Sequence, residues 1–206
     1  MDVYLIRHGE TDGNVARRHQ HDKTDINEIG TAQTKAIAKA IKRINPTHIV
    51  TSTNLRAVET AKLIIITCEL DLIPETSTAF EEIRRPSWLI GSSHFSLISA
   101  QYMWHWFFDY KLKGEMETYT PFLGRIIEAK RYLESLPDDA RVVVVSHSVF
   151  INIFLEHLCV EKRMSFWRAM KRLWKVFTMP NTSMIHLRHV HSEGGCHWEI
   201  VSDRVK

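Results

Sequence analysis

The sequence predicts an α/β fold, a three-layer sandwich in which a mostly parallel central sheet is flanked by helices. Short β-branched runs alternate with helix-like segments along the 206 residues, and such alternation is typical of a parallel sheet covered on both faces. A composition of 44% hydrophobic and 25% charged residues is that of an ordinary globular protein. Because no Pro-, Gly- or Ser-rich linker interrupts the chain, we expect a single domain spanning residues 1–206, with a small helical cap insertion at about 91–117.

The individual elements follow from local patterns. Strands are expected at short apolar runs, namely 3–7, 48–51, 70–74 and 141–146, with an antiparallel edge hairpin formed by 183–190 and 196–202 around a turn at 192–195. Helices are expected where apolar residues recur at helical spacing, namely 31–44, 55–69, 119–136 and 149–157. The segment 80–91 has no periodicity and is expected to be mostly loop.

Charge and cysteine content favour a cytoplasmic protein. Lys and Arg number 27 against 24 Asp and Glu, and this net charge of +3 is too small to indicate nucleic acid as a partner. Apolar runs stay far below the roughly 18 to 20 residues of a membrane span, so no integral membrane segment is expected, and the N-terminus has no export signal. The three widely separated cysteines, Cys68, Cys159 and Cys196, are expected to be reduced.

Reactive side chains follow three of the expected strands. Arg7 and His8 come after the first strand, Arg56 after the second, and His147 after the valine-rich strand. Ligands of open α/β sheets bind outside the carboxyl ends of the strands, so these groups are expected to converge on one pocket. Arginine forks bind phosphate bidentately without a metal ion.

Four segments resemble the motifs of a known family. RHGETDGN at 7–14 resembles the signature RHGETxxN, and STNLRAVETA at 52–61 resembles SxLxRAxxTA. Ser146-His147 resembles a third motif, and 25–30 and 180–183 are similar to two connecting loops. On these motifs the chain is identified as a member of the histidine phosphatase superfamily, with the phosphoglycerate mutase-like fold.

The resemblance implies a metal-independent phosphomonoester hydrolase without a cofactor. His8 would be the nucleophile and form a phosphohistidine intermediate. Arg7, Arg56, His147 and Asn14 would bind the phosphoryl oxygens. The substrate would be a phosphorylated small molecule or a phosphoprotein. Gly13 stands where mutases of this family usually carry a tryptophan, but a phosphoglycerate mutase-like phosphotransferase and a catalytically poor phosphoester-binding module remain alternatives.

The resemblance also implies a carboxylic acid as proton donor. Phe80-Glu81-Glu82-Ile83 fits the family pattern LxEI with Glu82 as the donor, while a shift of one residue would make it Glu81, and Glu115 is the next candidate. The loop departs from the family at 84–91, which is one residue longer, and Ser148 replaces the usual glycine after the second histidine. Gly114-Glu115 is similar to the first two residues of a Gly-Glu-Ser element of the family, and in this chain Met116 stands in place of the serine.

Three further features have open interpretations. A zinc site is an alternative at the C-terminal hairpin, which carries His186, His189, His191, Cys196 and His197, although strand alternation puts His186 on the opposite face. The basic amphipathic helix expected at 163–177 could pack on the domain or lie on a membrane surface. The aromatic segment 102–110 could shape the substrate pocket, form a homodimer contact or simply pack.

Overall fold

A computed structural model describes residues 1–110, 116–190 and 196–205 of the chain, the last three of these by backbone only. Its strands are β1 (Asp2–Arg7), β2 (His48–Thr51), β3 (Glu75–Thr76), β4 (Arg141–Ser146), β5 (Met184–His189) and β6 (Trp198–Val205). Its helices are α1 (Asp12–Val15), α2 (Glu28–Ile44), α3 (Leu55–Cys68), α4 (Leu97–Phe107), α5 (Tyr119–Glu134), α6 (Ser148–Glu156) and α7 (Phe166–Thr178), with 3₁₀ turns η1 (Thr78–Phe80) and η2 (Ser87–Leu89).

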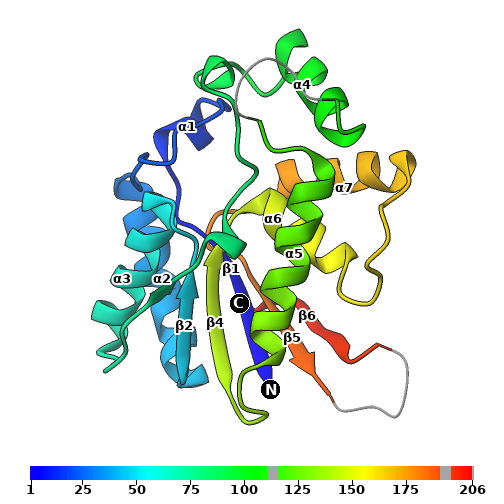
Figure 1. Cartoon of the computed structure of the whole chain (residues 1–206). Coiled ribbons are helices and arrows are strands. Elements are labelled where there is room, and N and C mark those ends of the chain that lie inside the picture. Colours follow the sequence, from blue (N-terminus) through cyan, green and yellow to red (C-terminus); the bar gives the residue numbers. More distant parts are fainter. Residues whose placement is uncertain (111–115, 191–195, 206) are drawn as a thin grey trace.

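The sheet has the order β3-β2-β4-β1-β5-β6. β1, β2, β3 and β4 run parallel, whereas β5 and β6 form the expected antiparallel hairpin at one edge. Figure 1 shows α2 and α3 on one face of the sheet and α5 and α6 on the other. The predicted α/β sandwich with a mostly parallel sheet is therefore confirmed.

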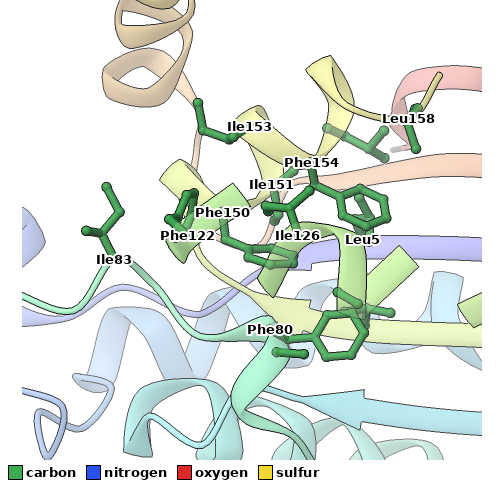
Figure 2. Packing of buried hydrophobic residues seen from close by; sticks show 14 of the residues in the cluster. Leu5, Phe80, Ile83, Phe122, Ile126, Phe150, Ile151, Ile153, Phe154 and Leu158 are labelled. Carbon is green, nitrogen blue, oxygen red and sulfur yellow. The ribbon is translucent and has the colours of Figure 1, made fainter. Parts of the chain in front are cut away.

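Each face of the sheet buries its own core, and strand alternation divides the residues of β4 between them. Val143 and Val145 pack under α2 and α3, while Val142 and Val144 pack under α5 and α6. Figure 2 shows the second core, in which Phe150 of α6 contacts both Phe80 and Phe122 of α5. Both faces of β4 are buried, which explains its uninterrupted run of valines.

Several predicted boundaries differ from the structure, and two of these differences have a clear physical reason. The third strand was expected at 70–74, but pairing occurs only at Glu75 and Thr76, because Pro74 has no N–H to donate to the ladder and Leu70 and Leu72 pack against the α2–α3 core instead. The helix expected at 31–44 begins at Glu28, since the Asn27 side chain accepts a hydrogen bond of 2.8 Å from the Gly30 amide and caps the helix there.

The expectation of three reduced cysteines is also wrong. Cys159, in the loop after α6, and Cys196, just before β6, form a disulfide, while Cys68 is a buried free thiol. The two partners are 37 residues apart, and the sequence gives no sign that the edge hairpin folds back onto this loop. The cysteine argument for a cytoplasmic location is thereby lost, and the compartment remains a prediction.

The C-terminal hairpin gives the zinc alternative little support. Cys196 is bonded to Cys159, and His186 lies 2.6 Å from the carboxylate of Asp2 and stacks on Tyr4. Residues 1–110, 116–190 and 196–205 contain no group of three or more potential ligands placed to hold a metal ion. His191, Gly114 and Glu115 lie outside the described residues, as does the turn expected at 192–195.

The helices α4 and α7 form a pair beyond the carboxyl ends of β1, β2 and β4 (Figure 1). α4 lies in the predicted insertion between β3 and α5, and α7 is the expected basic helix. Phe166 of α7 contacts both Trp104 and Phe108, whereas Phe177 contacts Phe95, so the two helices run antiparallel. In the described part of the chain, no helix has the length and apolar character needed to cross a membrane.

Candidate active site

The first, second and third motifs meet because β2, β4 and β1 are neighbours in the sheet. Arg7 is paired with Ser146, and Thr51 with Val145, so the residues that follow these strands emerge side by side. The His8 amide donates to the Ser146 carbonyl at 2.9 Å, and the rings of His8 and His147 lie 5.0 Å apart. The structure thus brings together the histidines predicted from the sequence.

His8 is buried, and its hydrogen bond defines which ring nitrogen is free. Nδ1 lies 2.7 Å from the Gly9 carbonyl oxygen, which can only accept, so Nδ1 carries the proton. Burial and the nearby Arg56 and Arg7 hold the pKa of His8 well below its usual value. The ring is therefore neutral near pH 7, and Nε2 keeps its lone pair, with no hydrogen bond to any described residue.

Gly9 is required by the close approach of the first motif to α2. A Cβ at this position would lie 2.8 Å from the Gly30 carbonyl oxygen, which is backbone and cannot move aside. The Gly9 amide donates to the Thr60 hydroxyl of α3 at 3.0 Å. These contacts with two helices fix the loop that carries His8.

His147 is fully buried at the start of α6, and a chain of hydrogen bonds orients its ring. The side-chain nitrogen Nδ2 of Asn54 donates to Asp22 at 2.8 Å. This leaves Asn54 Oδ1 to accept the Ser52 hydroxyl proton, also at 2.8 Å. Ser52 Oγ consequently accepts from His147 Nε2 at 2.8 Å, and Nδ1 is buried without a partner among the described residues. Burial, Arg56 and His8 lower the pKa of His147 well below its usual value.

Arg7 and Arg56 bring two guanidinium groups to the same place. Arg7 Nη1 donates to the Met179 carbonyl, and Arg56 Nη1 donates to the His21 carbonyl at 3.1 Å. In both residues Nε is buried and has no partner within the described structure. Burial lowers the pKa of each arginine to about 10, so both stay charged near pH 7. Two forks with unused N–H donors form a site suited to an oxyanion.

Glu82 and Glu81 face different surroundings. Glu82 is 7% exposed, accepts hydrogen bonds from the amides of Ile83 and Val149, and its charge acts on both Arg7 and Arg56. Glu81 instead accepts from the Thr53 hydroxyl and forms a 2.9 Å ion pair with Arg84. Of the two candidates, it is Glu82 that interacts with Arg7 and Arg56.

Asn14 lies at the edge of the site in α1. Its Oδ1 accepts from the Thr11 amide and from Asn181 Nδ2, at 3.3 and 3.1 Å, so its own Nδ2 is left to donate. Asn181 also donates to the His8 carbonyl at 3.0 Å and thereby links the loop at 180–183 to the first motif. Ser148 is the first residue of α6 with no positive φ, so it replaces the family's glycine without backbone strain.

Sequence reasoning missed two arginines. Arg85 was noted only as part of the departing loop, yet its charge lowers the pKa values of Arg56 and His147, and its Nε is buried without a partner among the described residues. Arg125 of α5 donates to the carbonyls of Thr78, Ala79, Glu81 and Glu82 and forms a buried 2.6 Å ion pair with Glu117. The sequence gave no signal of these roles, because Arg85 lies in a loop without periodicity and Arg125 is one of several basic residues in a helix.

A cleft of about 400 Å³ adjoins the site. Arg85 lines it, together with Gln20, His21, Asp22, Ile83, Pro86, Ser87, Trp88 and Ile90. The His21 carbonyl that accepts from Arg56 connects this cleft with the arginine pair. The cleft is placed to receive the part of a ligand that extends beyond an oxyanion bound at the arginines.

The chain matches one family model and part of a curated protein. The family model of the histidine phosphatase superfamily (branch 1) matches residues 3–201. The curated "Probable phosphoglycerate mutase GpmB" of Proteus mirabilis (strain HI4320) is 38% identical over 76 residues, which are 36% of this chain and 35% of that protein. The match thus spans about a third of the length of that relative.

Solved structures share the fold along almost the whole chain. Mycobacterial glucosyl-3-phosphoglycerate phosphatase in complex with VO3 has a TM-score of 0.73 at 20% identity and covers 100% of this chain and 99% of its own. A mutant phosphoserine phosphatase from Entamoeba histolytica in complex with phosphoserine has a TM-score of 0.70 at 19% identity, with coverages of 98% and 95%. The predicted phosphoglycerate mutase-like fold is confirmed, and the chain belongs to the histidine phosphatase superfamily, branch 1.

Proposed function

We propose that the protein is a metal-independent phosphomonoesterase that works through a phosphohistidine on His8. The observation that carries this proposal is the free Nε2 lone pair of His8 beside the unused N–H donors of Arg7 and Arg56. A neutral imidazole is a competent nucleophile near pH 7 and needs no separate base to activate it. The lowered pKa of His8 keeps the ring in that form.

The first step transfers the phosphoryl group to His8. Nε2 attacks phosphorus, the bond to the ester oxygen breaks, and Glu82 gives its proton to the departing alkoxide. Arg7 and Arg56 bind the phosphoryl oxygens, on which negative charge spreads in the transition state. These donors are held by backbone carbonyls before the substrate arrives, so little reorganisation is required.

His147 and Asn14 complete the phosphoryl site. Because Ser52 holds the Nε2 proton of His147, Nδ1 can donate to a phosphoryl oxygen only when the ring is protonated. A bound phosphate dianion favours that protonated form. The amide Nδ2 of Asn14 contributes a neutral donor from α1.

The second step returns the enzyme to its starting state. Glu82, now a carboxylate, takes a proton from a water molecule that attacks phosphorus, and the bond between phosphorus and Nε2 breaks. Inorganic phosphate leaves, and His8 regains its lone pair. Glu82 therefore ends protonated, ready for the next substrate.

Labelling tests the covalent step directly. Enzyme mixed with phosphate-labelled substrate and quenched in alkali, which preserves phosphohistidine, should carry label on His8, and the variant His8→Ala should show neither label nor turnover. Hydrolysis of p-nitrophenyl phosphate should persist in EDTA. Turnover by His8→Ala, or label on another residue, would exclude the proposed intermediate, and tight phosphate binding without turnover would support a binding module.

A mutase is the second candidate because of the partial match to a phosphoglycerate mutase. The two activities share the phosphohistidine and differ in what accepts the phosphoryl group. Labelled enzyme should release inorganic phosphate into water at the rate of steady-state turnover if it is a phosphatase. Release that is much slower than transfer to phosphoglycerate would favour the mutase.

A further inference from the structure

Half of the apolar face of α7 packs on the domain, and the other half faces solvent. Val176 is buried, and Ala169 and Leu173 are partly buried on the inner side. At roughly 100° per residue, the exposed Trp167, Met170, Trp174 and Phe177 fall on one neighbouring arc of the helix. Trp167 is 80% and Trp174 is 72% exposed, which is far more than packing on the domain requires.

The antiparallel helix α4 extends this exposed surface. Phe95, just before α4, is 65% exposed and contacts Phe177 with ring centroids 5.3 Å apart, while Trp104, 53% exposed, lies 5.9 Å from Phe166. We call the exposed side chains of the pair the α4–α7 surface; they are Phe95, Trp104, Trp167, Met170, Trp174 and Phe177.

The charges around this surface are positive. Neither the segment 92–108 nor α7 contains an Asp or Glu. Within the described residues, the acids close to it are already paired, since Glu156 binds Arg168 and Arg172, and Asp109 binds Arg163. Lys171 and Lys175 form no ion pair with any described residue, and Arg17 lies over the ring of Phe95. The α4–α7 surface thus presents tryptophans bordered by unneutralised cations.

We propose that the α4–α7 surface binds anionic lipid at a membrane surface. An exposed stripe of tryptophan, methionine and phenylalanine beside lysines is the pattern of helices that lie in the plane of a membrane interface, where indole rings sit at the level of the headgroups. Burial of the stripe removes apolar area from water, and the lysines attract acidic headgroups.

A second copy of this chain is a poorer occupant for the same surface. A two-fold contact would place the same patch of both subunits face to face. Lys171 and Lys175 of each subunit would then approach a surface that is also basic, with no carboxylate of 92–108 or α7 to offset them. An acidic lipid surface supplies the opposite charge that such a dimer lacks.

The location of the surface relates it to the candidate active site. α7 ends at Thr178, and the carbonyl of the next residue, Met179, accepts the hydrogen bond from Arg7. Phe177 also contacts the ring of His94, at 5.9 Å. Figure 1 places α4 and α7 at the end of the molecule towards which β1, β2 and β4 run, so a protein bound in this way would hold the active-site end near the membrane.

Vesicle sedimentation tests the proposal independently of any phosphatase activity. The wild-type protein should bind vesicles of equimolar phosphatidylserine and phosphatidylcholine, with a blue shift of tryptophan fluorescence, and bind pure phosphatidylcholine far more weakly. The double variant Trp167→Ser/Trp174→Ser should lose at least about tenfold in affinity. The double variant Lys171→Gln/Lys175→Gln should lose about 25-fold, at about fivefold per lysine.

Two controls keep the test decisive. Ile66, in α3, and Ile73, after α3, are exposed apolar residues, and Figure 1 shows α3 away from α4 and α7. The variant Ile66→Ser/Ile73→Ser should bind vesicles like the wild type. Near-normal hydrolysis of p-nitrophenyl phosphate shows that the tryptophan variant is folded. If the wild type has no activity, an unchanged circular dichroism spectrum shows the same. The proposal would be overturned if the wild-type protein did not bind acidic vesicles, or if both double variants bound them as the wild type does. It would also be overturned if light scattering showed a dimer that only the tryptophan variant fails to form.

Discussion

Two adjacent glutamates differ in the charge that surrounds them, and this difference separates their expected roles. Glu82 faces Arg7 and Arg56, whereas Glu81 is occupied by Thr53 and Arg84. Loss of a positioned proton donor slows a reaction by roughly 10² to 10⁴, and most for poor leaving groups. Glu82→Gln should therefore lower kcat/KM for alkyl phosphates by that factor, and kcat/KM for p-nitrophenyl phosphate much less.

The matched control is Glu81→Gln, which should change kcat/KM for either substrate by less than about threefold, because Glu81 is engaged by Thr53 and Arg84. The readout is the ratio of the two substrates' kcat/KM values for each variant, because kcat/KM reports transfer to His8 and not the later hydrolysis of the phosphohistidine. A large effect of Glu81→Gln on alkyl phosphates with a benign Glu82→Gln would assign the proton transfer to Glu81. Equal effects of Glu82→Gln on both substrates would show that Glu82 is not a proton donor.

The predictable residues of the site are those whose position follows from a strand end. Arg7, His8 and His147 continue buried strands, and neighbouring parallel strands end at one edge, so their meeting could be expected from the sequence. Arg85 could not be found in this way. It lies in a loop without periodicity, and its direction depends on the turn at η2 and on the packing of Leu89.

At the scale of elements, α5 holds the loop that carries Glu82. Arg125 donates to four carbonyls of 78–82, and a lysine cannot reproduce that fork of donors. Arg125→Lys should lower kcat/KM for alkyl phosphates by roughly tenfold with KM little changed, and lower kcat/KM for p-nitrophenyl phosphate less, as expected for a residue that positions Glu82. Stopped-time assays of both substrates measure this.

Arg131→Lys, on the same helix and exposed, is the control and should leave both substrates unaffected. The Arg125 variant should also unfold more easily, by about 1 to 3 kcal/mol, because buried carbonyls lose their donors. A stability loss without any change in the ratio of the two substrates would reduce Arg125 to a structural role.

The disulfide joins two elements that the sequence did not connect. Cys159 follows α6 and Cys196 precedes β6, and closing a loop across 37 residues restricts the unfolded chain. The variant Cys159→Ser/Cys196→Ser should lose about 2 to 4 kcal/mol of unfolding free energy, measured in urea. Dithiothreitol should lower the unfolding free energy of the wild type to the same value and leave that of the double variant unchanged. A wild-type unfolding free energy that does not change on reduction would mean that the disulfide contributes nothing to stability.

Elements were predictable where one local signal dominates and were missed where two signals compete. The bounds of β4 match the prediction, since a run of valines buried on both faces suits a central strand and little else. At 70–76, the apolar Leu70 and Leu72 suggested a strand. In the structure they pack against the α2–α3 core, and the residues that pair with β2 are the polar Glu75 and Thr76. The Cys159–Cys196 bond depends on how the hairpin folds back, which no local pattern records.

At the scale of the whole molecule, several histidines are buried without charge. The pKa of His8 and of His147 lies well below the usual value because both are buried among arginines. Burial lowers the pKa of His19 to about 3 and of His94 to about 4, with Arg85 adding to both effects. The folded protein therefore resists protonation at histidines in loops and at the N-cap of α6, which are far apart in the chain.

This burial makes stability depend on pH in a defined direction. In the unfolded chain these histidines bind protons below about pH 6.5, while in the folded chain they stay neutral, so the unfolded state binds more protons as the pH falls. Their contribution is complete above about pH 6.5, and each histidine should remove about 1.4 kcal/mol per pH unit down to its folded pKa. Urea unfolding should thus show an unfolding free energy that falls steeply between about pH 6.5 and pH 4. His94→Gln should reduce the slope of that fall by up to about 1.4 kcal/mol per pH unit, the contribution of one proton. A slope that is unchanged in His94→Gln would mean that His94 titrates normally in the folded protein, and stability that rises with acid would contradict the burial of neutral histidines altogether.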